Sequence, residues 1–211
     1  MNEESSVLRF PWPNIARQRE GVAFGMWTFL GSEVLFFGGL FLSYAVYRTL
    51  YPQAFDTGSA ATDIFYGTVN TAILLTSSFL MTLALHGSER GARGIVATCM
   101  LATAAFGLAF LGVKALEYAE DIDKHLVPGP HFPLHPETTR LFFAFYWVST
   151  GIHAIHLFVG IVVTIFLGTQ VARGKMTPKS TAIEAASLYW HFVDSIWIVL
   201  YALIYLPGRS A

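Results

Sequence analysis

The sequence predicts an all-α integral membrane protein built as a bundle of five transmembrane helices. The chain has 211 residues, of which 54% are apolar and 13% are charged. That charged share is about half of what an average soluble domain carries. Three segments contain no Asp, Glu, Lys or Arg at all, namely 64–88, 94–113 and 141–172. Each is long enough for a helix across a bilayer core, which needs about 20 residues. The composition therefore excludes a disordered chain and argues against an ordinary soluble enzyme.

The order of apolar and polar segments places the spans. They are expected near 23–47, 65–86, 94–116, 141–168 and 187–207. The connections would be a loop at 48–64, a tight turn at 87–93, a long loop at 117–140 and a second polar loop at 169–186. Four prolines prevent the long loop from being helical throughout. Residues 1–22 would form a cytoplasmic N-terminal segment and residues 208–211 a C-terminal tail.

The distribution of Lys and Arg predicts the orientation, because cytoplasmic loops carry an excess of these residues. With the N-terminus inside and the C-terminus outside, the inner side holds eight of them and the outer side five. The inner set is Arg9, Arg17, Arg19, Arg90, Arg93, Arg173, Lys175 and Lys179, and the outer set is Arg48, Lys114, Lys124, Arg140 and Arg209.

Charge and cysteine content exclude several functions. The net charge is −1, so no basic surface indicates a nucleic acid partner. Cys99 is the single cysteine, which excludes an intrachain disulfide and any cysteine-rich metal site. No sequence repeat of the kind found in many transporters is present.

Small residues within two of the spans predict close helix packing. Gly31, Gly38 and Gly39 recur along the first span, and the third carries Ala105, Ala109 and Gly112. Small side chains let helix backbones approach closely in lipid.

Polar side chains at membrane depth are costly and are therefore candidate site residues. Glu33 lies in the first span, His153 and His156 in the fourth, and His191 and Asp194 in the fifth. With alternating helix directions, Glu33, His156 and Asp194 fall at similar depth in the inner half. The sequence thus allows one polar cluster joining the first, fourth and fifth spans.

Three explanations for such a cluster remain open. It could fix the bundle by internal hydrogen bonds, it could serve lipid headgroup or proton-linked chemistry at Glu33, or it could hold a metal or haem. The di-iron Glu-x-x-His pattern is absent. His153 and His191 are expected at depths about 15 Å apart, which disfavours a haem held by both.

Other polar residues are expected at the surface. Lys114 and Glu117 close the third span and should extend to the outer interface. His125, His131 and His135 lie in the long loop at irregular, proline-broken spacing, which favours a solvated loop over a metal site. No self-contained active site is predicted.

Several segments resemble subunit III of the haem–copper oxidases. They cover nearly all of residues 20–207 in the order expected of the family. The matching segments are Gly25–Arg48 with its intramembrane Glu in a Ser-Glu-Val context, Gly151–Gly160 (GIHAIHLFVG), Tyr189–Trp197 (YWHFVDSIW), Asn70, Thr71 and Lys114–Tyr118 (KALEY).

The resemblance implies a short, five-helix bacterial form of the family. Mitochondrial members have seven helices, and their first two form a V-shaped cleft with the other five that holds phospholipids. Some five-helix relatives receive these two helices from a fused subunit I. The family bundle packs on subunit I, away from subunit II.

The resemblance also implies a non-catalytic role. Subunit III of this family binds no haem or copper, which lie in partner subunits. It stabilises subunit I, supports proton uptake and binds phospholipid. The complex reduces O₂ to water with electrons from cytochrome c or quinol, and it pumps protons across the bacterial cytoplasmic membrane. Glu33 matches the carbodiimide-reactive carboxylate of the family, and Glu33, His153, His156, His191 and Asp194 are expected to form the lipid- or proton-linked polar interior.

Three alternatives remain open at this point. One is the subunit-III-like accessory protein of nitric oxide reductases, which shares these motifs. Another is a free-standing membrane b-type cytochrome that uses the histidine pairs. A transporter or channel would need a polar stripe across the full membrane depth, whereas the polar residues identified here gather in the inner half.

Overall fold

The computed structural model describes residues 13–130 and 132–209. Helices account for nearly all of the described secondary structure, and no strand occurs within it. The helices are α1 (Ile15–Leu50), α2 (Pro52–Ala61), α3 (Ile64–Glu89), α4 (Arg93–Asp123), α5 (Thr139–Ala172) and α6 (Thr181–Ile204). Five of these, all except the short α2, are long and apolar enough to cross a membrane. The predicted fold class is therefore confirmed.

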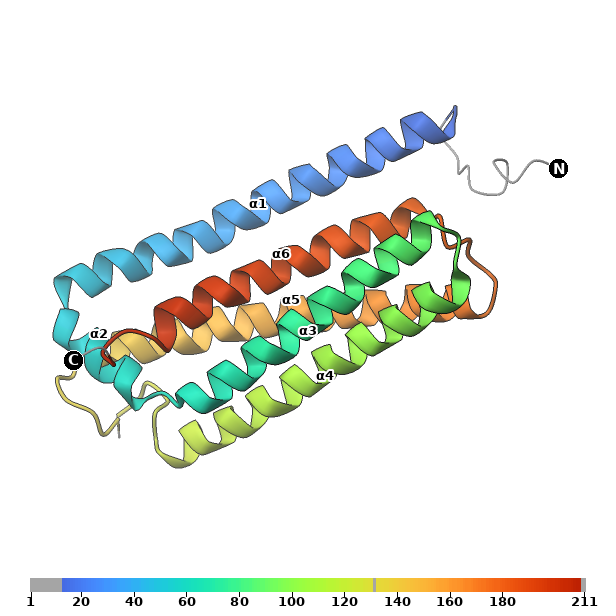
Figure 1. Cartoon of the computed structure of the whole chain (residues 1–211). Coiled ribbons are helices and arrows are strands. Elements are labelled where there is room, and N and C mark those ends of the chain that lie inside the picture. Colours follow the sequence, from blue (N-terminus) through green and yellow to red (C-terminus); the bar gives the residue numbers. More distant parts are fainter. Residues whose placement is uncertain (1–12, 131, 210–211) are drawn as a thin grey trace.

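Four of the long helices pack as a bundle. Figure 1 shows α3, α4, α5 and α6 side by side, and neighbouring pairs are in contact around the bundle. The core contains many aromatic side chains, and Phe110, Tyr146, Trp190 and Trp197 are fully buried in it. Trp190 and Trp197 of α6 donate their indole N–H groups to Ser77 Oγ and Thr71 Oγ1 of α3, each at 3.1 Å. Buried indole groups thus keep their hydrogen-bond partners.

Helix α1 lies along the outside of this bundle, against α5 and α6 (Figure 1). In its most apolar stretch only 17% of residues are buried, compared with 44% in α6. Its contact is a narrow seam of Leu30, Phe37 and Tyr44, which recur every seven residues and are buried. A seven-residue repeat keeps one stripe of a helix facing its neighbour. The opposite side of α1 is open.

Local sequence explains the ends of the helices. Asn14 caps α1 by accepting from the Arg17 N–H at 2.8 Å, and Asp63 caps α3 by accepting from the Phe65 N–H at 2.8 Å. Pro52 begins α2, where its missing N–H costs nothing. Gly91 has a φ of 70° in the turn between α3 and α4. Glycine enters this left-handed region without steric cost, which permits so tight a turn.

The helices extend well beyond the predicted spans. Helix α1 begins at Ile15 instead of 23, α4 continues to Asp123 instead of 116, and α6 begins at Thr181 instead of 187. The expected loop at 48–64 contains α2, and the first turns of the expected loop at 117–140 are helical. Polar residues continue a helix beyond the apolar core because only the apolar stretch must match the bilayer thickness. The predicted N-terminal segment as far as residue 12, Arg9 within it, His131 and the last two tail residues lie outside the described residues.

The glycines that allow close contact between helices of the bundle differ from the predicted ones. A Cβ added at Gly31, Gly38, Gly39 or Gly112 would meet nothing within 4 Å, so these positions face open space. The close approaches occur at other glycines. A Cβ at Gly107 would lie 2.8 Å from Ile161 Cγ1. Within this chain the prediction for the first and third spans is wrong, because composition does not say which side of a helix faces the bundle.

Candidate functional site

Glu33 and His156 form a direct pair between α1 and α5. His156 Nε2 lies 3.1 Å from Glu33 Oε2, and the two side chains are 21% and 17% exposed. His156 Nδ1 lies 2.9 Å from the Ile152 carbonyl oxygen. Because a carbonyl oxygen can only accept, Nδ1 must carry a hydrogen. The contact at Nε2 then requires one further proton, held by the carboxyl or by the imidazole.

Neighbouring groups fix this pair in place. The Phe37 ring of the α1 seam packs edge-on against the His156 ring, with centroids 5.3 Å apart. The Tyr189 hydroxyl of α6 donates to the His156 carbonyl oxygen at 2.9 Å. The pair is therefore positioned by α1, α5 and α6 together, although α6 contributes Tyr189 and not Asp194.

His153 lies one turn before His156 but in different surroundings. It is 1% exposed and packs against the rings of Phe110 and Trp197, with centroids 5.7 and 5.2 Å away. Neither ring nitrogen has a hydrogen-bond partner among the described residues.

His191 and Asp194 face α3 instead of α1. His191 Nδ1 lies 2.8 Å from Ser78 Oγ, and Nε2 lies 3.5 Å from Thr82 Oγ1. Asp194 is 4% exposed and stands beside Ser78. Neither of its carboxyl oxygens makes a hydrogen bond of ordinary geometry within the described chain. The five candidate residues thus occupy three separate places, and the single cluster that the sequence allowed is not formed.

A buried ionic cluster, which we name the Lys114 cluster, joins α4 and α5 to the residue that follows α6. It consists of Lys114, Glu117, Asp121, Tyr146 and Tyr205, all at most 5% exposed. Lys114 Nζ donates to Glu117 Oε2 at 3.0 Å, to Tyr146 OH at 3.0 Å and to Tyr205 OH at 2.9 Å. Tyr146 donates to Asp121 Oδ2 at 2.6 Å, and Tyr205 to Glu117 Oε1 at 2.6 Å.

The Lys114 cluster overturns the expectation that Lys114 and Glu117 reach the outer interface. Helix α4 continues past both residues, so their side chains face the bundle interior, where charged partners and two phenols satisfy them. Sequence reasoning missed Asp121, Tyr146 and Tyr205. A signal was present, since positions 114, 117 and 121 share one helix face at a spacing of three and four.

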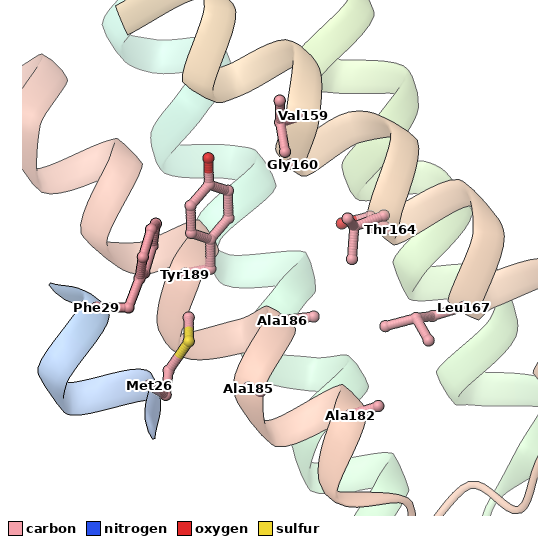
Figure 2. Close-up of a pocket in the computed structure, with 11 residues that line it drawn as sticks. Met26, Phe29, Val159, Gly160, Thr164, Leu167, Ala182, Ala185, Ala186 and Tyr189 are labelled. Carbon is pink, nitrogen blue, oxygen red and sulfur yellow. The ribbon is translucent and has the colours of Figure 1, made fainter. Parts of the chain in front are cut away.

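An apolar pocket opens between α1, α5 and α6. It has a volume of about 380 Å³. Met26 and Phe29 of α1 line it beside α6, and in Figure 2 the small side chains of Ala182 and Ala186 of α6 point toward α5. The α5 wall contains Gly160, Thr164 and Leu167. Tyr189, which donates to His156, stands at its edge, so the apolar pocket borders the Glu33–His156 pair. No group of three or more His, Cys, Asp or Glu side chains arranged to hold a metal occurs in the described part of the chain.

Comparisons with known proteins agree with this architecture. The family described as cytochrome c oxidase subunit III matches residues 14–209. Cytochrome c oxidase subunit 3 of Thermostichus vulcanus is 35% identical over 191 residues, which are 88% of this chain and 87% of the relative. Cytochrome bo(3) ubiquinol oxidase subunit 3 of Pseudomonas aeruginosa is 31% identical over 88% of this chain and 84% of its own length.

A third relative is a larger protein. The heme-copper oxidase subunit I+III of Aeropyrum pernix is 29% identical over 95% of this chain, which corresponds to 24% of the relative. In that protein the matching region is one part of a longer chain. With a family match that spans the entire described bundle, this multi-pass membrane protein belongs to the cytochrome c oxidase subunit III family.

Proposed function

We propose that the chain is the non-catalytic subunit III of a bacterial respiratory haem–copper terminal oxidase in the cytoplasmic membrane. The observation that carries this proposal is the family match over residues 14–209. The complex reduces O₂ to water and pumps protons, with haem and copper held by its other subunits. The N-terminus faces the cytoplasm, in accordance with the Lys and Arg distribution.

Subunit I is the proposed packing partner, in one complex with subunit II. The Aeropyrum pernix relative supports this pairing, because its name joins subunits I and III in one chain. The open side of α1 offers an apolar surface for such a partner, including Phe24, Leu35 and Leu42, which are more than half exposed. Gly31 and Gly38 on this helix leave room for close approach of another helix.

The Glu33–His156 pair is the proposed proton-linked group of the subunit. Its geometry requires one proton that either partner can hold, so a shift of this proton leaves the net charge unchanged. A neutral pair is tolerated at membrane depth far better than an isolated carboxylate. Together with His153, His191 and Asp194, it forms the polar interior through which we propose that subunit III supports proton uptake.

The apolar pocket is the proposed place for a phospholipid chain. Its walls are almost entirely apolar. An acyl chain fits this chemistry, because it needs apolar contact and no hydrogen-bond partner.

Purification of the intact complex tests the proposed function. An affinity tag on this chain should recover subunits I and II, identified by mass spectrometry, together with haem absorbance that stays with subunit I when the subunits are separated. Phospholipid should be released on extraction. Recovery of nitric oxide reductase subunits instead, or a Soret band that remains with this chain alone, would overturn the proposal.

A further inference from the structure

A second hollow, which we name the polar hollow, opens between α3, α6 and the start of α1. It has a volume of about 620 Å³. Its mouth carries the cations Arg19 and Lys179 and the carboxylates Glu89 and Glu184. Because two cations stand against two carboxylates, the mouth has no net charge that would concentrate an anion or a cation. Its chemistry fits water.

The floor of the polar hollow is also polar. Ser187 and His191, four residues apart on one face of α6, both line it. Ser187 is 1% exposed, and its hydroxyl has no hydrogen-bond partner in the described chain. Buried hydroxyls in proteins are usually satisfied, by the protein or by ordered water. Because Ser187 lines an open hollow, water from that hollow is the partner that would satisfy this hydroxyl.

The same face of α6 continues to Asp194. Asp194 follows Ser187 by seven residues, or about 10 Å along the helix axis. Between them His191 contacts Ser78 and Thr82 of α3, so polar groups from both helices lie between the polar hollow and Asp194. Beyond them lies the Asp194 carboxyl, which is buried beside Ser78 and makes no hydrogen bond of standard geometry among the described residues.

A buried carboxyl without hydrogen bonds is costly in either protonation state. Buried water commonly satisfies such groups, and each molecule needs two to four polar partners. The Asp194 oxygens and the adjacent Ser78 hydroxyl supply partners of this kind. The Glu33–His156 pair does not supply a hydrogen-bond partner to Asp194, because the pair lies on the α1 side of the bundle.

We propose that the polar hollow is a water-filled inlet which leads from the N-terminal side of the membrane past Ser187 and His191 to Asp194. The inlet gives this carboxyl access to protons from that side. It requires only that the bundle spans a membrane, and it does not depend on the assignment to an oxidase.

Cysteine accessibility tests the inlet in the assembled complex in vesicles, on a Cys99→Ser background. Ser187→Cys and Asp194→Cys probe its floor and its end. Ser77→Cys is the matched control, because Ser77 is also fully buried but is engaged by Trp190 and does not line the hollow. The probe is a small, charged, membrane-impermeant methanethiosulfonate, and the readout is the mass of this subunit over time.

We expect Ser187→Cys and Asp194→Cys to react at least about tenfold faster than Ser77→Cys, because the reaction needs a hydrated thiolate. The reagent should act from the N-terminal side only. Equal rates for Ser187→Cys and Ser77→Cys, or equal reaction from both sides, would overturn the inlet. Reaction at Ser187→Cys without reaction at Asp194→Cys would refute its extension to Asp194.

These results are separable from the proposed function. Fast labelling of a chain that co-purifies with no oxidase would support the inlet and overturn the oxidase assignment. Inert cysteines in an intact oxidase would overturn the inlet alone.

Discussion

Replacement of Lys114 by Met should destabilise the bundle strongly. Lys114 Nζ makes three hydrogen bonds of 2.9–3.0 Å inside a cluster that also buries Glu117 and Asp121. The Met side chain keeps most of the apolar stem but leaves the buried Glu117 carboxyl without its cation, next to the Asp121 carboxyl. Removal of one partner from a buried ion pair typically costs about 3–5 kcal/mol, because the other charge stays buried and uncompensated. We expect a loss in that range.

The measurement is the free energy of unfolding of the purified chain in detergent, followed by circular dichroism. Lys124→Met is the matched control on the same helix. Lys124 pairs with Glu120 at 3.4 Å, but the two side chains are 53% and 44% exposed. Its loss should leave the stability unchanged within error, because exposed pairs are screened by solvent.

A double variant tests whether the cost arises from the uncompensated charge. Lys114→Met with Glu117→Gln removes one cation and one carboxylate together, so it should be less destabilised than Lys114→Met alone. Contacting residues show such non-additivity. If Lys114→Met costs less than about 1 kcal/mol, the range of an exposed pair, or if the double variant is worse than the single one, the reasoning is refuted.

Three further variants test other contacts. Gly107→Ala should cost about 1–3 kcal/mol of unfolding free energy in the same assay, because its Cβ would lie 2.8 Å from an α5 side chain. Gly38→Ala is the control: its Cβ would meet nothing within 4 Å, so it should be neutral or slightly stabilising. Equal effects of the two variants would contradict the packing argument. His156→Leu should speed the labelling of Glu33 by a hydrophobic carbodiimide several-fold, because it removes the base that competes for the shared proton; unchanged labelling would argue against proton sharing. Ser59→Ala should lower the free energy of unfolding by about 1–3 kcal/mol, because the Ser59 hydroxyl donates to the carbonyl oxygens of Ile204 and Pro207 at 2.6 and 2.7 Å. It should also make the C-terminal segment more susceptible to carboxypeptidase. Unchanged resistance to the protease would show that these hydrogen bonds are not needed to hold the segment.

The spans were predictable because the bilayer imposes a length and a polarity on each of them. Helix ends were harder to place. The segment from Lys114 to Asp123 holds several charged residues, so its composition resembles a loop, yet the structure continues α4 through it. Only the spacing of Lys114, Glu117 and Asp121 indicates a helix face, and the partners that justify their burial, Tyr146 and Tyr205, come from distant parts of the chain.

The candidate site was predicted in part. Glu33 and His156 meet as their depths in the first and fourth spans suggested. His191 faces α3 instead, because its rotational position on α6 directs it to Ser78. Depth follows from counting residues along a span, whereas the direction of a side chain around the helix axis depends on which neighbours the bundle places there. Counting residues along the sequence therefore predicts the depth of a side chain but not its direction around the helix axis.

Helix α1 connects the features on which these proposals depend. Arg19 lines the polar hollow, while Met26 and Phe29, about two to three turns further along, line the apolar pocket. The first half of one helix therefore borders both spaces, and Glu33 follows directly after it. A narrow seam of Leu30, Phe37 and Tyr44 packs α1 against the bundle. A partner that packs on the open side of α1 can therefore change the position of this helix relative to the bundle. Helix α1 is therefore the element that the apolar pocket, the polar hollow and the Glu33–His156 pair share.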